Sequence, residues 1–336
     1  MEKILSLLIP SYNMEKYLQY CLDSLLIKDN IELIEVLVIN DGSRDKTLEI
    51  AKTYESRYPE MFKVVDKPNG NYGSCINRGL QEATGKYVKI LDADDSFDTE
   101  NFNEFVKFLL SHDADLIISD FVTVNEDRAV TNKYEYKFGV VACRLEDICN
   151  SSRFLSMEMH AVTYRLELLR ENHYIQTEGI SYTDQQWIFE PMAYVADVCI
   201  FNKFVYKYLV GRDGQTMNSD IMVKKIPDRI KMTLDIVSHY NDISKNQPDA
   251  IAEYLLTRAR LNLYQIYSGY FFNRKRINRV EILEFDKALR DADEKLYYVM
   301  AKHNKQVRYW RLISRSRILD RIYCACFSSL FKILRK

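Results

Sequence analysis

Two aspartates separated by a single residue follow directly after a short apolar run in this sequence. The run covers residues 87–91, and Asp92, Ala93 and Asp94 come next. An apolar run of this length is typical of a β-strand, so both carboxylates are expected where the strand leaves its sheet. Carboxylate oxygens suit Mg²⁺ or Mn²⁺, which commonly take further ligands from phosphates and water. The spacing favours a divalent-metal site that neutralises a departing diphosphate; a solvated acidic turn is the alternative interpretation.

Other apolar runs end in polar loops in the same way. They cover residues 4–9, 36–39 and 116–118, and the loops after the first two contain Pro10, Tyr12, Asn13 and Asp41. Ligands of parallel sheets bind beyond the carboxyl ends of the strands, so one crevice at this edge explains all of these loops. Asp41 could accept hydrogen bonds from a base or a ribose in that crevice, or it could cap the helix that follows it.

The elements that must position these loops alternate between strand-like and helix-like segments. This alternation predicts an α/β fold, with a mostly parallel sheet flanked by helices on both faces. From residue 226 onward, apolar residues recur at helical spacing, which predicts a C-terminal helical region.

The composition is that of an ordinary globular protein. The chain has 336 residues, of which 47% are hydrophobic and 28% charged, enough for a sizeable core in one or two domains. Its seven cysteines stand at irregular spacings, which favours reduced thiols over a disulfide framework. The first apolar run is too short for a signal peptide, and no window approaches the length of a transmembrane helix. We therefore expect a cytoplasmic protein.

The C-terminal segment carries a charge that the net charge of −1 conceals. Residues 302–336 contain ten lysines and arginines and a single acidic residue, Asp320. Apolar and aromatic residues recur among them at helical spacing, which is typical of a basic amphipathic helix on an anionic membrane. The alternative is a terminal helix that packs on the protein's own core and exposes a basic face. Nucleic-acid binding is not expected, because the basic residues are confined to one end of an otherwise acidic chain.

A set of motifs follows in one order along the chain. They are residues 9–13 (IPSYN), 39–45 (INDGSRD), 69–79 (NGNYGSCINRG) and 85–95 (GKYVKILDADD). Together they resemble the family 2 glycosyltransferases of the GT-A (Rossmann-like) fold, of the bacterial cell-surface polysaccharide type. The resemblance covers about residues 3–215. It implies a nucleotide-sugar donor, usually UDP-linked, and inversion at the sugar carbon by direct displacement.

The resemblance also implies roles for individual residues. The base and ribose of the donor meet the loop at residues 10–13 and Asp41, Asp92 lies near the ribose, and Asp94 binds the metal with Asp92 beside it. The cofactor is Mn²⁺ or Mg²⁺, between which the motif does not distinguish. The complete set expected to bind the nucleotide sugar is Pro10, Tyr12, Asn13, Asp41, Asn77, Lys86, Asp92, Ala93 and Asp94.

An inverting transfer needs a general base that takes the proton of the acceptor hydroxyl. The resemblance assigns this role to Asp184, which stands in a Thr-Asp pair before an expected helix over residues 185–194. An aspartate is ionised at neutral pH without any shift of its pKa. The alternative is that Asp184 only caps that helix, where the helix dipole favours a carboxylate. His160, Trp187 and Arg212 are expected on the acceptor side, and Arg212 could reach phosphate or lie in an exposed turn.

These expectations define a function and a domain organisation. We predict a hexosyl- or N-acetylhexosaminyl-transferase that moves one sugar to a glycan acceptor. The processive synthases of the family carry a Gln-x-x-Arg-Trp motif that this sequence lacks. Residues 1–215 form the catalytic domain, residues 216–300 a helical extension and residues 301–336 the basic tail.

The basic tail favours a lipid-linked acceptor in capsule, exopolysaccharide or lipopolysaccharide synthesis, reached from the inner face of the cytoplasmic membrane. The alternatives are a nucleotide-sugar-binding scaffold without turnover and a sugar nucleotidyltransferase. The latter should have a glycine-rich phosphate loop after its first strand, which residues 10–13 do not form. The sequence leaves open the sugar, the acceptor, the linkage and the oligomeric state.

Overall fold

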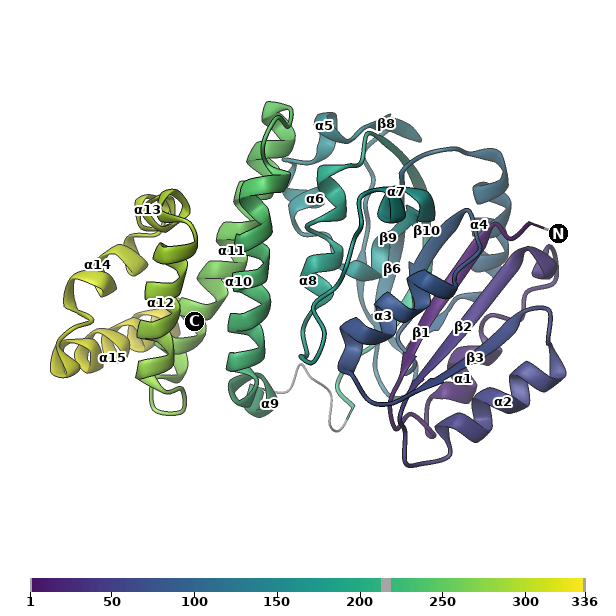
Figure 1. Ribbon diagram of the computed structural model, residues 1–336, viewed down its shortest axis with the longest axis horizontal. Helices are drawn as coiled ribbons and strands as arrows, with labels where there is room; N and C mark the ends of the chain where they lie inside the picture. The colour runs from purple at the N-terminus through teal and green to yellow at the C-terminus, as the bar shows by residue number, and fades with distance from the viewer. Residues whose placement is uncertain (1, 213–218, 335–336) are drawn as a thin grey trace. The chain divides into compact units, whose positions relative to one another are not determined.

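The computed structural model describes residues 2–212 and 219–334. The chain divides into two compact units, Met1–Asp213 and Gly214–Lys336, and each is described by itself. Figure 1 shows the first as a sheet with helices around it and the second as helices. The expected α/β class with a C-terminal helical region is confirmed.

The first unit is built on one mixed sheet with the strand order β3-β2-β1-β4-β9-β6-β10-β5; β7 pairs with β6, and β8 pairs with β10. Every residue of β1 is buried, as expected for a strand covered on both faces. The strands are β1 Leu5–Ser11, β2 Ile34–Asp41, β3 Phe62–Lys67, β4 Tyr87–Ile90, β5 Ser96–Phe97, β6 Leu116–Val124, β7 Val130–Tyr134, β8 Ala142–Arg144, β9 Val162–Arg165 and β10 Asp197–Leu209.

The strand direction decides which loops meet. β1 pairs in parallel with β2 and β4, and β6 pairs in parallel with β10. β9 is inserted between β4 and β6 and runs antiparallel to both. The segment that leads into β9 therefore lies at the edge where β4 and β6 end, beside the acidic loop that follows β4.

Helices pack on the sheet and carry the loops at its edge. α3 packs on β1 and β2, α2 packs on β3, and α4 packs on β10. The Asp98 carboxylate caps α4 by accepting a hydrogen bond from the Asn101 amide. The helices of this unit are α1 Leu18–Asp23, α2 Thr47–Arg57, α3 Asn71–Glu82, α4 Thr99–Ser111, α5 Leu145–Ile148, α6 Ser152–Leu155, α7 Leu166–Glu171 and α8 Asp184–Trp187, with 3-10 turns η1 Ile31–Leu33, η2 Met159–Ala161 and η3 Pro191–Ala193.

The helix expected over residues 185–194 is shorter in the structure. α8 is a single turn, and η3 follows it from Pro191. Pro191 has no amide hydrogen to donate to the carbonyl four residues before it, so the α-helix does not continue and a 3-10 turn forms instead. Asp184 is the first residue of α8, and Thr183 is its N-cap.

The second unit is helical throughout its described residues outside short connections. Its helices are α9 Ser219–Lys224, α10 Ile226–Ile243, α11 Asp249–Asn273, α12 Arg279–Ala292, α13 Glu294–His303, α14 Lys305–Ile313 and α15 Arg317–Leu334. α11 packs against α10, α12, α13 and α15 (Figure 1). Tyr270 of α11 and Trp310 of α14 are fully buried, and both donate hydrogen bonds to the buried Asp320 of α15. None of the described helices is both long and apolar enough to cross a bilayer.

Candidate functional site

The acidic loop after β4 is tied into the fold by its last aspartate. Asp95 is fully buried and accepts hydrogen bonds from the Tyr206 hydroxyl (2.6 Å) and the Leu209 amide (2.7 Å) of β10. Burial raises its pKa well above the usual range, and the charges of Asp94 and Asp92 raise it further. Asp95 therefore fixes the loop to the sheet and leaves the two preceding carboxylates at the crevice.

Asp92 lies in a strongly negative environment. Burial raises the pKa of Asp92 to about 7, and the carboxylates of Asp94 and Asp184 contribute to the rise. The Tyr72 hydroxyl donates a hydrogen bond of 2.7 Å to the Asp92 carboxylate. The charge of Asp184 therefore acts on the Asp92 carboxyl group.

Asp94 is paired with an arginine. Its carboxylate lies 2.5 Å from Arg212 Nε, and both side chains are mostly buried. The Arg212 guanidinium also stacks over the ring of Tyr17. Arg212, expected on the acceptor side, thus contacts the expected metal ligand directly.

A second arginine near the loop was missed by the sequence analysis. Arg128 lies in the turn between β6 and β7, where its φ is +61°. Its guanidinium donates a hydrogen bond to the Asp94 carbonyl and stacks over Tyr20 at 4.0 Å. A single arginine in a polar turn gives no sequence signal, because its position depends on the pairing of β6 with β7.

The side chains present fit a divalent cation. Asp92, Asp95 and His160 each offer a ligand atom, and these atoms lie within 4.8 Å of one another. Burial, with a smaller effect of Lys89, lowers the pKa of His160 to about 3, so its imidazole is neutral and able to bind a metal. His160 Nδ1 is buried and has no hydrogen-bond partner in the described part of the chain. Crowded carboxylates and a neutral imidazole are a suitable donor set for Mn²⁺ or Mg²⁺, although Asp94 itself is engaged by Arg212.

Asp41 organises the start of α3. It is nearly buried, and its carboxylate accepts hydrogen bonds from Lys67 Nζ (2.6 Å) and from the amides of Gly70 (2.9 Å) and Asn71 (3.0 Å). Asn71 is the first residue of α3, so Asp41 caps this helix and not the one that follows it in the sequence. The carboxylate still lies at the end of β2, on the expected edge.

The loop after β1 is fixed by hydrogen bonds at the same edge of the sheet. The Asn13 side chain accepts a hydrogen bond from the Arg44 amide, and the Ser43 hydroxyl accepts one from the Asn13 amide. Asn13 has a φ of +56°, which an asparagine tolerates. Pro10 is the last but one residue of the buried strand β1, and Tyr12 is 44% exposed. This exposed ring is available for stacking on a base.

Three expected site residues do not line the crevice directly. Lys86 precedes β4 at the opposite edge of the sheet from Asp92, and it pairs with Asp113. Trp187 is fully buried, with edge-to-face contacts to Tyr164 and Tyr174. The Asn77 amide nitrogen donates to the Gln176 carbonyl and the Glu178 carboxylate.

Asp184 is positioned by a clamp of buried amides that the sequence analysis missed. Gln176 Nε2 donates to the Thr183 hydroxyl (2.7 Å), and the Thr177 amide donates to Gln186 Oε1 (3.0 Å). Gln176, Thr183 and Gln186 are fully buried. Asp184 thus lies between two residues that are bonded to the segment 176–177.

That segment rests on α3. The Asn77 side chain accepts a hydrogen bond from the Gln176 amide (2.8 Å) and donates one to the Gln176 carbonyl (2.9 Å). A Cβ atom on Gly73 would lie 2.0 Å from the Thr177 carbonyl oxygen, so only glycine permits this approach. α3 therefore sets the position of Asp184 through the segment 176–177.

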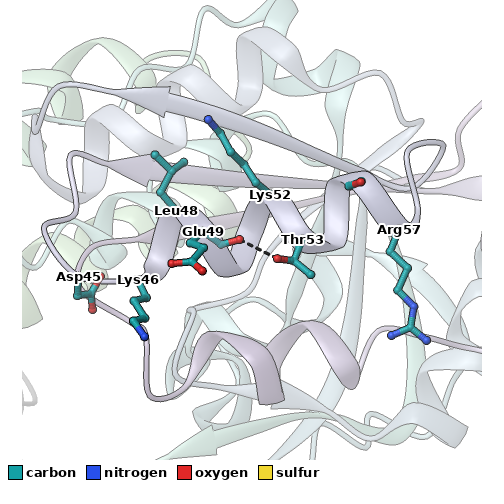
Figure 2. Close-up of a pocket in the computed structure, with 8 residues that line it drawn as sticks. Asp45, Lys46, Leu48, Glu49, Lys52, Thr53 and Arg57 are labelled. Carbon is teal, nitrogen blue, oxygen red and sulfur yellow. Dashed lines mark hydrogen bonds between the residues drawn. The ribbon is translucent and has the colours of Figure 1, made fainter.

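A separate depression lies on the outer surface of the first unit. Figure 2 shows it along α2, where the Thr53 hydroxyl donates a hydrogen bond to the Glu49 carbonyl. Its lining is Asp45, Lys46, Leu48, Glu49, Lys52, Thr53, Ser56 and Arg57. It contains none of the residues of the acidic site.

Comparison with solved structures gives the class of fold. The Staphylococcus aureus TarS 1–349 structure in complex with UDP-GlcNAc superposes with a TM-score of 0.68, at 20% identity, over 98% of this chain and 91% of that one. The mannosyltransferase PcManGT of Pyrobaculum calidifontis, in complex with GDP-Man and Mn²⁺, gives 0.51 at 17% identity. The fold is that of the GT-A glycosyltransferases.

Sequence comparison gives the family. The model of glycosyl transferase family 2 matches residues 6–167. An uncharacterized glycosyltransferase of Mycoplasma pneumoniae, the MG025 homolog, is 31% identical over 52% of this chain and 58% of its own length. The poly(ribitol-phosphate) beta-N-acetylglucosaminyltransferase TarS of Staphylococcus aureus is 26% identical over 64% of this chain and 37% of its own length. The chain thus spans less than two thirds of these relatives, and its residues 6–167 are similar to the family 2 glycosyltransferases.

Proposed function

We propose that the chain is an inverting glycosyltransferase that moves one hexose or N-acetylhexosamine from a UDP-sugar to a hydroxyl of a glycan acceptor. The observation that carries the proposal is the pairing of Asp94 with Arg212 beside Asp92 at the edge where β4 ends. The charge of Asp184, which helps to raise the pKa of Asp92, supports its place in the same site. A donor linked to UDP is supported by the shared fold of TarS, which was solved in complex with UDP-GlcNAc.

Asp184 is proposed as the general base. It takes the proton of the acceptor hydroxyl while that oxygen forms a bond to the anomeric carbon and the bond from this carbon to the diphosphate breaks. Because the attack comes from the side opposite the leaving group, the configuration inverts. The buried amides of Gln176 and Gln186 keep Asp184 in place during this step.

The remaining residues are proposed to hold the donor. Tyr12 stacks on the base, with Pro10, Asn13 and Asp41 beside it, and Asp92 and Ala93 border the ribose. Arg212 exchanges the Asp94 carboxylate for oxygens of the diphosphate, since both acceptors suit its guanidinium. Mn²⁺ or Mg²⁺ held by Asp94 and Asp92, when bound, would neutralise the charge of the departing diphosphate.

The acceptor is proposed to be a lipid-linked glycan of cell-surface polysaccharide synthesis, met at the inner face of the cytoplasmic membrane. The positive charge of residues 302–336 supports this location. None of the seven cysteines forms a disulfide in the described part of the chain, which suits a reducing compartment. Residues 1–215 would then act as the catalytic domain, residues 216–300 as a helical extension and residues 301–336 as the membrane-proximal tail.

The donor site is tested by thermal shift with UDP-, GDP-, dTDP- and CMP-sugars, with and without Mn²⁺. We expect one UDP-sugar to raise the melting temperature in the presence of Mn²⁺, because a ligand that binds only the native state stabilises it. Asp94→Ala should abolish the shift. A wild-type protein that responds to no nucleotide sugar would refute the proposed function.

The base is tested by UDP release from the donor so identified, with a bacterial lipid-linked oligosaccharide extract as acceptor. Asp184→Asn should lower the turnover by about 10²- to 10⁴-fold and leave the thermal shift unchanged. Asp197→Asn, at an exposed aspartate paired with Arg144, is the matched control and should turn over normally. Equal turnover of Asp184→Asn and the wild type would exclude Asp184 as the base.

A further inference from the structure

The last two helices expose a row of large apolar side chains. Leu312 of α14 is 76% exposed, Ile318 and Ile322 of α15 are 72% and 54% exposed, and Leu319 is 48% exposed. Ile318 and Ile322 are four residues apart and so lie on one face of α15. Exposed aliphatic side chains that share a face of a helix in a folded domain indicate a surface that is covered in function.

These side chains are not the core-facing stripe of the tail. The buried positions of the same helices are Val307 and Trp310 in α14, and Asp320 and Cys324 in α15. Trp310 contacts the rings of Tyr267 and Phe271, and the Asp320 carboxylate accepts hydrogen bonds from Tyr270 and Trp310. One face of the tail thus completes the core of its unit, and a second apolar face is left over.

Among the residues whose burial the structure describes, the exposed charged side chains of residues 305–327 are all basic. Arg315, Arg317 and Arg321 are exposed beside the apolar row. Within the described residues, neither Arg317 nor Arg321 pairs with a carboxylate. Asp320, the one acidic residue of the segment, is buried and turned inward. The result is a basic–apolar surface made of Leu312, Ile318, Leu319, Ile322, Arg315, Arg317 and Arg321.

We propose that this basic–apolar surface binds an anionic lipid bilayer and lies in its interface. Aliphatic side chains enter the boundary of the acyl chains, while the long arginine stems let the guanidinium groups stay among anionic headgroups. Aliphatic residues beside unpaired arginines complement a negatively charged bilayer in both hydrophobicity and charge. The inference deepens the proposed function, since it names the surface that would meet a lipid-linked acceptor, but the binding itself needs no turnover.

The apolar contribution is tested by flotation of the full chain with vesicles of phosphatidylglycerol and phosphatidylcholine in equal parts. The wild type should float with these vesicles and not with phosphatidylcholine alone. Leu312→Ser/Ile318→Ser should bind about tenfold or more weakly, because two inserted side chains are lost. Val280→Ser/Tyr298→Ser, at apolar positions of α12 and α13 that are 51% and 55% exposed, should bind as the wild type does. Equal loss in both pairs would overturn the proposal.

The charge contribution is tested in the same assay. Arg317→Gln/Arg321→Gln should weaken binding on the order of thirtyfold at low salt, and the effect should shrink as salt rises. Lys287→Gln/Lys295→Gln, which removes the same charge from exposed sites in α12 and α13, should have little effect. The proposal would be overturned if vesicle binding depended neither on the charge of the lipid nor on Arg317 and Arg321.

Two measurements keep this inference separate from the proposed function. UDP-sugar thermal shifts should be unchanged in both surface variants, so a failure of donor binding in the wild type refutes the transferase proposal alone. Light scattering gives the oligomeric state. If Leu312→Ser/Ile318→Ser converts a dimer into a monomer while vesicle binding persists, the surface joins two copies of the chain and the bilayer proposal is wrong.

Discussion

The contact between α3 and the segment 176–177 predicts a large effect of a very small substitution, Gly73→Ala. The new Cβ would lie 2.0 Å from the Thr177 carbonyl oxygen, whereas ordinary contact begins at 3.4 Å, so the segment must move by about 1.4 Å. The obstacle is backbone and not the end of a flexible side chain. Asp184 should follow the movement, because hydrogen bonds join the segment 176–177 to Thr183, which precedes Asp184, and to Gln186, which follows it.

A displacement of this size should lower kcat by about 10²-fold, since misplacement of a catalytic group by 1 Å can cost that much. The substitution does not destabilise the helix itself, because alanine is more favourable than glycine in a helix by roughly 1 kcal/mol. UDP release gives kcat and KM for the donor, and nucleotide titration gives the donor affinity. We expect the loss in kcat, with donor affinity nearly unchanged.

Gly79→Ala is the matched control on the same helix. The three atoms nearest to its Cβ would all belong to the Leu8 side chain, the first at 2.8 Å, and this side chain can change its rotamer. This variant should lose some stability from tighter packing and keep its kcat. If Gly73→Ala fails to fold, Gln186→Leu removes both hydrogen bonds to Thr177 and tests the same clamp. Wild-type kcat in a folded Gly73→Ala or Gln186→Leu protein would refute the positioning of Asp184 by α3.

Two further predictions concern buried charges. Arg212→Met should strengthen Mn²⁺ binding to the nucleotide-free protein by about ten- to a hundredfold in calorimetry, because the guanidinium no longer competes for Asp94; an unchanged affinity would contradict this competition. Burial lowers the pKa of Lys89 to about 7, so between about pH 7 and 10.5 the unfolded chain binds a proton that the folded chain does not. Stability should therefore rise with pH in that window, by up to about 1.4 kcal/mol per unit, and Lys89→Met should lose this slope in urea unfolding; parallel slopes in the two proteins would contradict it.

The fold could be predicted from the sequence where the signal is local. The apolar runs before Asp41 and Asp92 are the strands β2 and β4, and their loops do reach one edge of the sheet. Strand length, strand direction and the ligand edge of parallel sheets are enough for that conclusion. The surroundings of Asp92 could not be predicted from such local signals. β9 is inserted antiparallel between β4 and β6, and this insertion brings His160 beside Asp92 and Asp95.

A residue that belongs to a sequence motif of the site does not necessarily line the site in the fold. Lys86 belongs to the same motif as Asp92, but the two lie beyond opposite ends of β4, whose four residues span roughly 13 Å, and so at opposite edges of the sheet. Trp187 follows the expected base closely, yet a helical turn directs it into the core against Tyr164. An aromatic residue that fills a core and one that lines a pocket look alike in sequence, since both are large and apolar.

The apolar residues of the C-terminal tail are ambiguous in the same way, and the structure divides them into a buried face and an exposed face. Helical periodicity indicates that a helix has an apolar face, but it does not say how many such faces there are or what covers each. Trp310 and Asp320 point into their own unit, so the interpretation of a packed terminal helix describes that face. Ile318 and Leu312 lie on the other side with arginines around them, and only this face is available for a bilayer. Deleting the whole tail would remove the buried Trp310 and Asp320 together with the exposed row, so only point substitutions on the exposed face can test membrane binding without unfolding the unit.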